Sequence, residues 1–591
     1  MCGIVGGVSP KPIRNYLING LKTIEYRGYD SAGIAVFKNR ETKVYKVRGR
    51  VDDLDKSLPE INSLVGIGHT RWATHGEPSV INAHPHTSHH GLFSIVHNGV
   101  IENFRLLKSS LLEKGYVFKS ETDTEVIANL LEEEFNKIQD PLQAISLTIK
   151  KLKGSYALAI MFLHHPDKVY FAKNRSPLLI GHAKEGNYLA SDYLPMLKIA
   201  KDFVTISDYQ YGYISLDDIK LFNQDGTSVK IIYHATDIKA ESLDLNGYDH
   251  YMLKEIEEAD NCIRLLLDNY YDGQSFLFDK AMLKEIEEAE NIIFLACGTS
   301  YHASLLGVKY FRKIGKKAEA YIASEWAFYP YIPSSKTIYI FVSQSGETAD
   351  LIHCMSIVKN SGGSIITITN TQGSTLSRLA NHTVLLYAGV EVAVASTKAY
   401  VAQVALLALL GGALKSDLTI IKDLEEVIAA QREIMKNHQS IIEIADFVAS
   451  KKDVYFLGRG YDYDLALEYS LKLKETSYIH SEAFPGGELK HGPIALIEKD
   501  TPVIGLISDL KTAEPMRSNL HEVAARGARL IIVSSKSVSH GDDSFVVQDV
   551  PLYLSPLVKV VFGQYLSYYV ALKRGVNIDK PRNLAKSVTV E

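Results

Sequence analysis

The second half of this chain contains an internal repeat, and this repeat constrains the fold more than any other feature of the sequence. The segment 291–298 (NIIFLACG) resembles 453–460 (DVYFLGRG), and 338–348 (IYIFVSQSGET) lines up with 502–512 (PVIGLISDLKT). Each segment is an apolar run that leads into a helical pattern, which is typical of parallel strands covered on both faces. The repeat therefore predicts two copies of one doubly wound α/β domain, with ligands bound at the carboxyl ends of the strands.

Only the first copy carries a hydroxyl-rich turn, SQSGET, at the end of its strand. A helix is predicted to begin near Ala349, and helix N-termini offer unpaired N–H groups and a positive dipole end to a phosphate. The hydroxyl groups of Ser343, Ser345 and Thr348 would complete a cradle. Helix capping explains most single Ser or Thr residues, but it explains three of them around Gly346 less well. Because the GxxxxGK[ST] loop of nucleotide sites is absent, the turn favours a sugar phosphate.

The N-terminus carries a second indication of chemistry, because Cys2 follows the initiator methionine and heads an apolar run. A small residue at this position normally permits removal of Met1, which would leave Cys2 with both a thiol and a free α-amine. An α-amine with a pKa of about 8 can act as the base for that thiol. Most cysteines are small buried residues instead, but the motifs of the N-terminal third favour a nucleophile.

Composition excludes several classes of function. The formal net charge of −5 gives no basic field that would attract nucleic acid or anionic lipid. The four cysteines contain no CxxC pair, which argues against zinc ribbons, iron–sulfur clusters and a disulfide framework, and fits a reducing cytosol. No signal pattern is present, and apolar stretches such as 401–414 are too short to span a bilayer. We therefore expect a cytoplasmic protein.

The pattern along the chain predicts five segments. They are an N-terminal domain at 1–240, a linker with helices at 241–286, the first repeat domain at 287–430, the second at 431–580 and a C-terminal tail at 581–591. The stretch MLKEIEEA at 252–259 returns at 282–289, across the end of the linker segment. We interpret both copies as solvated amphipathic helix starts and assign them no function.

Ten motifs along the chain occur in the order of one known family. They lie at 1–6 (MCGIVG), 25–33 (EYRGYDSAG), 69–76 (HTRWATHG), 97–103 (HNGVIEN), 121–126, 297–300 (CGTS), 343–348, 395–398 (ASTK), 488–493 (ELKHGP) and 581–591. Over essentially its whole length the chain resembles the glutamine–fructose-6-phosphate aminotransferases (isomerising), or glucosamine-6-phosphate synthases. The resemblance implies an N-terminal-nucleophile hydrolase αββα sandwich, which is a glutaminase, followed by two doubly wound sugar-isomerase (SIS) domains.

The resemblance also implies roles in the glutaminase domain. Cys2 would attack the carboxamide of glutamine, with the Asn98 side chain and the Gly99 backbone N–H as oxyanion hole. Arg71 would bind the α-carboxylate and Asp123 the α-ammonium group, although without the family both could equally be surface ion-pair partners. The remaining matches are glutamine-binding Thr74, His75 and Arg27, and Trp72 as the gate of an ammonia channel.

In the isomerase half, the resemblance implies a Schiff base between Lys586 and the C2 carbonyl of fructose 6-phosphate. Glu475 would move a proton between C1 and C2, with Lys472 on the same helix face, and His491 would help to open the sugar ring in the neighbouring subunit. The matches to the sugar-phosphate site are Thr299, Ser300, Ser343, Gln344, Ser345, Thr348, Val394 and Ser396.

The implied reaction converts L-glutamine and D-fructose 6-phosphate to L-glutamate and D-glucosamine 6-phosphate, the first step of amino-sugar synthesis. The resemblance implies a homodimer and no metal, organic cofactor, nucleic acid or membrane partner. Three alternatives stay open: another glutamine amidotransferase, a regulator that senses sugar phosphates, and a deaminating or deglycating relative. Another glutamine amidotransferase would need a nucleotide or diphosphate site. A regulator would have no use for Lys586 and Glu475. The presence of Cys2 argues against a deaminating or deglycating relative.

Overall fold

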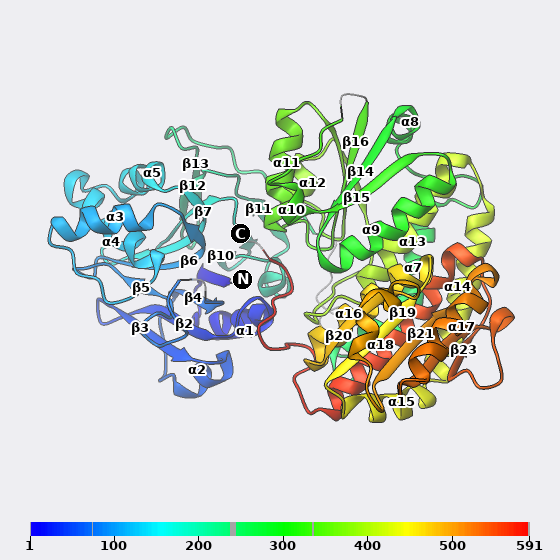
Figure 1. The fold of residues 1–591 in the computed structure, drawn as a ribbon. Helices are drawn as coiled ribbons and strands as arrows, with labels where there is room; N and C mark the ends of the chain where they lie inside the picture. The colour runs from blue at the N-terminus through cyan, green and yellow to red at the C-terminus, as the bar shows by residue number, and fades with distance from the viewer. Residues whose placement is uncertain (1, 74, 237–243, 334–335, 589–591) are drawn as a thin grey trace. The chain divides into compact units, whose positions relative to one another are not determined.

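A computed structural model describes residues 2–73, 75–236, 244–333 and 336–588 of the chain. The chain divides into two compact units, one of residues up to 244 together with the extreme C-terminus, and one of residues 245–586 (Figure 1).

The described part of the first unit contains two largely antiparallel sheets. The first sheet has the order β11 (Asp202–Thr205), β9 (Leu179–Ala183), β10 (Gly186–Ala190), β1 (Gly3–Val8), β4 (Val65–Arg71), β2 (Ser31–Lys38) and β3 (Glu41–Arg48). The second has the order β13 (Ile219–Phe222), β12 (Tyr211–Ile214), β8 (Val169–Asn174), β7 (Gly154–Phe162), β6 (Phe93–Ile101) and β5 (His86–Thr87).

Helices cover the outer face of each sheet. Helix α1 (Arg14–Ile24) contacts β1 and β4, and helix α4 (Asp123–Ile138) contacts β6 and is paired with α5 (Pro141–Lys151). One apolar cluster joins the facing sides of the two sheets, and another joins the second sheet to α4 and α5. The predicted αββα sandwich is confirmed. Helices α2 (Val51–Ser57) and α3 (Phe104–Glu113) complete this unit's longer helices among the described residues.

The second unit contains two parallel sheets with the same topology. The first has the order β15 (Lys317–Ile322), β14 (Asn291–Ala296), β16 (Thr337–Ser343), β17 (Ser364–Thr369) and β18 (His382–Leu385). The second has the order β20 (His480–Pro485), β19 (Asp453–Gly458), β21 (Pro502–Ile507), β22 (Arg529–Ser535) and β23 (Phe545–Val547). The prediction of two doubly wound copies is confirmed.

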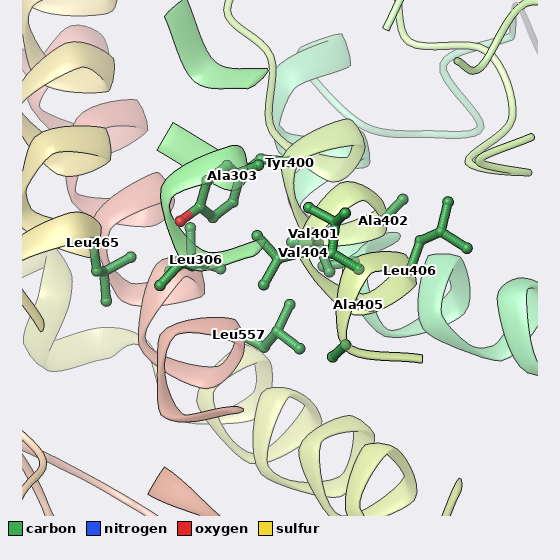
Figure 2. Packing of buried hydrophobic residues seen from close by; sticks show 14 of the residues in the cluster. Ala303, Leu306, Tyr400, Val401, Ala402, Val404, Ala405, Leu406, Leu465 and Leu557 are labelled. Atoms are coloured by element: carbon green, nitrogen blue, oxygen red, sulfur yellow. The ribbon is translucent and has the colours of Figure 1, made fainter. Parts of the chain in front are cut away.

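Helices of the two copies meet in one apolar core. Figure 2 shows side chains of α13 (Lys398–Lys415) beside those of α9 (Gly298–Lys313), α16 (Tyr461–Ser477) and α18 (Ser555–Lys573). Among the residues that the structure describes, α13 is the one helix long and apolar enough to cross a membrane by length and composition, so the expectation that the stretch at 401–414 is too short is wrong. However, 89% of this helix is buried inside the protein. It is therefore a core helix of the second unit. The other helices around these sheets are α11 (Ala349–Asn360), α12 (Thr375–Leu379), α14 (Thr419–Lys436), α15 (Gln439–Ala449), α17 (Leu510–Ala524) and the short α10 (Ala323–Trp326).

The repeated MLKEIEEA segments form helices, but one part of their interpretation is wrong. The first copy lies in α6 (Tyr251–Glu257), whose Met252, Glu255 and Ile256 are buried, and it is followed by α7 (Ala259–Tyr270). The second copy lies in α8 (Lys280–Glu288), whose polar side chains are mostly accessible to solvent. The first copy is thus not a solvated helix start, because its polar face packs inside the unit. Residues 237–243, which end the predicted N-terminal domain and begin the predicted linker segment, lie outside the described residues.

Candidate active sites

Cys2 lies at the start of β1, beside the end of β4. The Trp72 backbone N–H donates to Cys2 Sγ at 3.3 Å, and the thiol lies 3.5 Å from the Trp72 carbonyl oxygen. Burial raises the pKa of the Cys2 thiol, and the positive charge of Arg71 opposes this only in part. The thiol therefore needs a base before it can act as a nucleophile.

Strand β6 brings Asn98 to the same place. The Asn98 side-chain Nδ2 donates to the Cys2 carbonyl oxygen at 2.9 Å, and its Oδ1 lies 3.1 Å from His69 Nε2. Gly99 has a φ of 132°, and a Cβ atom there would lie 2.1 Å from the Ser155 carbonyl oxygen. Only glycine fits this backbone, because both the conformation and the space exclude a side chain.

His69 orients the Asn98 amide and was not predicted as a site residue. Burial lowers the pKa of His69 to about 3, so its ring is neutral. Its Nε2 faces two acceptors, Asn98 Oδ1 and the His97 carbonyl oxygen at 2.9 Å, and therefore carries the proton. The amide nitrogen of Asn98 is thereby turned toward Cys2. A period-two pattern in β4 could have indicated His69, because it shares a strand face with Arg71.

The predicted glutamine-binding charges lie near Cys2. Arg71 is 3% exposed, and its Nη2 donates to the carbonyl oxygens of His75 at 2.5 Å and Gly76 at 2.9 Å. Asp123, the first residue of α4, accepts the Ile101 N–H at 2.8 Å. Arg71 and Asp123 both act electrostatically on the Cys2 thiol, so one charge of each sign is close to the nucleophile.

Three further residues were predicted to bind glutamine, and the structure describes two of them. The centre of the His75 ring lies 4.8 Å from that of the Phe104 ring, and the two rings are tilted by 39°. Arg27 is buried and ion-paired with Asp192 at 2.5 Å, so its guanidinium group already has a carboxylate partner. Thr74 lies outside the described residues.

The predicted cradle lies between β16 and α11, which begins at Ala349 as expected. Ser343 Oγ accepts the Gly346 N–H at 3.0 Å and lies 3.1 Å from Thr348 Oγ1, so the hydroxyl groups face one another across the turn. Gly346 has a φ of 66°, and a Cβ atom there would lie 2.1 Å from Ser374 Oγ. The turn is therefore held tightly, with Ser345 and Gln344 half-buried at its tip.

Helix α16 of the second copy brings charged groups to the first copy. Glu468, which was not predicted, accepts hydrogen bonds from Thr299 Oγ1 at 3.1 Å and His302 Nδ1 at 2.8 Å. Lys472 lies 3.6 Å from Glu468 and 2.5 Å from Glu475, in agreement with the predicted shared helix face. The i, i+4 spacing to Lys472 is the signal that could have indicated Glu468. Ser300 accepts a hydrogen bond from Gln403 Nε2 at 2.9 Å.

The side chain of Lys586 is 5% exposed and pairs with Glu391 at 2.5 Å. Glu391 also accepts the Ser396 hydroxyl at 2.9 Å and the Thr397 and Ala399 N–H groups, which open α13. Burial opposes ionisation, but the Lys586 ammonium group and these hydrogen bonds hold the pKa of Glu391 below its usual value. The sequence did not indicate Glu391, which lies 195 residues from Lys586 along the chain.

Val394 and His491 are the last two residues predicted for the sugar site. The Val394 N–H donates to the Asp579 carbonyl oxygen at 2.9 Å, so this loop is bound to the start of the C-terminal tail. His491 is exposed at the end of a short 3₁₀ turn, Glu488–His491. Among the described residues, no group of three or more His, Cys, Asp or Glu side chains is arranged to hold a metal ion.

Comparison with known proteins identifies the class to which this arrangement belongs. Residues 69–198 match the glutamine amidotransferase domain, and residues 285–412 and 447–574 each match the SIS domain. The chain is thus a glutamine amidotransferase domain joined to two SIS domains.

Relatives of the same length define the family. The chain is 43% identical to glutamine–fructose-6-phosphate aminotransferase (isomerising) of Staphylococcus aureus strain COL and to that of Geobacillus kaustophilus, over 100% of each chain. A solved C-terminal domain of glucosamine-fructose-6-phosphate aminotransferase from Francisella tularensis is 35% identical, with a TM-score of 0.54, and covers 57% of this chain and 99% of its own. The chain belongs to the glutamine–fructose-6-phosphate aminotransferase (isomerising) family.

Proposed function

We propose that this protein transfers the amide nitrogen of L-glutamine to D-fructose 6-phosphate and isomerises the product to D-glucosamine 6-phosphate, with release of L-glutamate. The observation that carries the proposal is the buried pair of Lys586 and Glu391 in the same unit as the hydroxyl cradle. A lysine in a C-terminal tail is usually solvated, and a buried one with a single carboxylate partner is suited to covalent chemistry with a ketone.

In the glutaminase unit, Cys2 attacks the carboxamide carbon of glutamine, and the thiol proton moves to the α-amine that removal of Met1 would expose. Asn98 Nδ2 and the Gly99 N–H stabilise the oxyanion, and His69 fixes the orientation of the Asn98 amide. Arg71 and Asp123 bind the two charged ends of the amino acid, with His75, Thr74 and Arg27 as further contacts. The α-amine returns the proton to the amide nitrogen, which leaves as ammonia while the thioester forms. Water then hydrolyses the thioester to glutamate and restores the Cys2 thiol.

In the isomerase unit, the cradle of Ser343, Gln344, Ser345 and Thr348 binds the phosphate group, with Thr299, Ser300, Val394 and Ser396 around the sugar. Lys586 Nζ loses a proton and attacks C2 of the open-chain ketose, and water leaves as the iminium forms. Ammonia then adds to C2 and displaces the Lys586 amine, which leaves an iminium at C2 that carries the glutamine-derived nitrogen. This positive nitrogen acidifies the C1 proton, which Glu475 takes up and returns at C2, and C1 becomes the aldehyde carbon of the amino sugar. Lys472, 2.5 Å from Glu475, holds that carboxyl group in position.

The protein is further proposed to act as a cytoplasmic homodimer, in which His491 of one subunit serves the sugar site of the other. The exposure of His491 supports this assignment. Ammonia must reach the sugar unprotonated, because ammonium is not nucleophilic. We therefore propose a channel gated by Trp72, whose backbone contacts Cys2. Light scattering of the purified protein tests the dimer.

The decisive experiment incubates the untagged protein with glutamine and fructose 6-phosphate and quantifies glutamate and glucosamine 6-phosphate in parallel. Equimolar products are the expected result. Glutamate without amino sugar would contradict the proposed acceptor, and no glutamate at all would contradict the role of Cys2.

A further inference from the structure

The repeated MLKEIEEA segment occurs in two different environments, although its eight residues are identical. In α8, the Glu285 carboxylate is 41% exposed and accepts hydrogen bonds from Ser364 and His382. In α6, the equivalent Glu255 is 2% exposed. The first copy therefore has a buried carboxyl group that the amphipathic pattern does not require.

The Glu255 carboxyl group binds the loop that precedes α13. Its Oε1 accepts the N–H groups of Val392, at 2.5 Å, and Ala393, at 3.1 Å. These residues directly follow Glu391, the partner of Lys586. A buried N–H group without an acceptor is costly, so the backbone of this loop depends on Glu255.

The N-terminus of α6 is bound to the segment that leads to Lys586. The two carboxylate oxygens of Asp579 accept the N–H groups of Tyr251, at 3.0 Å, and Met252, at 2.8 Å. The Asp579 carbonyl oxygen accepts the Val394 N–H. One short helix thus contacts both the loop that carries Glu391 and the tail that carries Lys586.

We propose that Glu255 is a positioning residue for Lys586, because its carboxyl group holds the Val392–Ala393 backbone and so places Glu391 against the lysine. The inference rests on the proposed function, in which Lys586 forms the Schiff base. Glu255 does not touch the substrate in this proposal and acts only through the loop.

The charges around Glu255 agree with a neutral carboxyl group. The charged groups that act on it are Glu391, Lys586 and Lys398, and Lys398 also interacts with Glu258 and Cys262. Lys398 pairs with Glu258 at 2.6 Å and Lys586 pairs with Glu391, so Glu255 has no cation of its own among the residues that the structure describes. Burial, and then the neighbouring Glu391, raise the pKa of Glu255 to about 8. A neutral Glu255 leaves Glu391 as the anion that faces Lys586.

The test compares Glu255→Met, Glu255→Gln and the matched control Glu285→Met in the full-length protein. Methionine keeps the length of the side chain but accepts no hydrogen bond from the loop, whereas glutamine keeps one acceptor and is neutral. Each variant is mixed with fructose 6-phosphate and borohydride, which reduces the Schiff base to a stable amine, and the rate of adduct formation is measured by mass spectrometry. Glutamine hydrolysis is measured as the internal control.

We expect Glu255→Met to form the adduct about tenfold more slowly than wild type or worse, with unchanged glutamine hydrolysis. Glu255→Gln should stay within about threefold of wild type, since one neutral acceptor remains for the loop. Glu285→Met should equal wild type. If Glu255→Met does not fold, Glu255→Asp replaces it, because its shorter side chain cannot reach the loop, and the same loss is expected.

Two results would overturn the inference: equal adduct rates in Glu255→Met and Glu285→Met, or a loss in Glu255→Gln as large as in Glu255→Met. Failure of the proposed function would give a different experimental result. In that case wild-type protein binds fructose 6-phosphate but forms no adduct, and the positioning role falls with it.

Discussion

The two SIS copies share one topology but differ at the carboxyl end of their central strands. In the first copy, β16 ends at Ser343 and the turn presents hydroxyl groups that face one another. In the second copy, β21 ends at Ile507, and Lys559 Nζ donates to the Ile507 carbonyl oxygen and to Ser508 Oγ, both at 2.6 Å. The second copy thus places a buried lysine of its own at the edge where the first copy presents the cradle.

This difference shows that two domains with the same topology can differ in ligand binding through the turn at the end of one strand. The second copy keeps its sheet and its core, but its strand end carries an internal ion pair of Lys559 with Asp462 at 3.5 Å. It contributes to the first copy through α16 instead, where Glu468 accepts hydrogen bonds from Thr299 and His302 and lies 3.6 Å from Lys472. The two copies have therefore become unequal halves of one proposed site rather than two sites.

The largest effect in this comparison is expected from removal of the buried lysine that the proposed reaction uses. Lys586→Met is expected to lower glucosamine 6-phosphate synthesis by about a thousandfold or more, because it removes the proposed nucleophile. Glutamine hydrolysis should persist, since Cys2 lies in the other unit. A coupled assay of both products measures this, and synthesis within tenfold of wild type would contradict the role of Lys586.

The second test concerns the turn itself. Gly346→Ala places a Cβ atom 2.1 Å from Ser374 Oγ at a φ of 66°, so the turn must move. We expect fructose 6-phosphate to bind about a hundredfold more weakly. The aligned residue of the second copy is Leu510, which is 74% exposed, and Leu510→Ala is the matched control. Calorimetric titration of both variants checks this, and equal affinities would mean that the cradle does not bind the sugar phosphate.

The third test asks whether the second copy's lysine is purely structural. Lys559→Met leaves Asp462 buried without its cation and is expected to lower the free energy of unfolding of this unit by about 3 kcal/mol. The affinity of the folded protein for fructose 6-phosphate should not change. Thermal unfolding and titration at low temperature separate the two effects. Weakened sugar binding in the folded variant would show that the second strand end also serves the ligand.

The sequence was informative where the interactions are local. The turn at 343–348, the start of α11 at Ala349 and the contact of Lys472 with Glu475 all follow from short-range patterns. The partners that orient the proposed catalytic groups come from distant strands and loops. Glu391 lies 195 residues from Lys586, and His69 lies 29 residues from Asn98. Periodicity carries no information on such pairs, because tertiary packing decides them.

The duplicated MLKEIEEA segment also shows that tertiary packing, and not local sequence, decides the environment of a residue. It leads to the smallest of the predicted effects, a pH dependence of stability. Identical sequences bury Glu255 in α6 and leave Glu285 partly exposed in α8. Burial, and then Glu391, raise the pKa of Glu255 to about 8, whereas the Ser364 hydroxyl and His382 lower that of Glu285. The native state therefore holds an extra proton on Glu255 at neutral pH, which the unfolded chain, with a carboxyl pKa of about 4.3, has lost.

The sign of the resulting pH dependence follows from that proton. Between about pH 5 and 8, unfolding of wild type releases it, so the free energy of unfolding falls as pH rises, by at most about 1.4 kcal/mol per pH unit. Glu255→Gln cannot titrate, and its melting temperature relative to wild type should rise steadily from pH 6 to 7.5. Glu285→Gln should show a constant difference, since that carboxylate is ionised in both states over this range. A constant difference for Glu255→Gln as well would mean that Glu255 is ionised in the native protein, and the two copies of the segment would then not differ in charge.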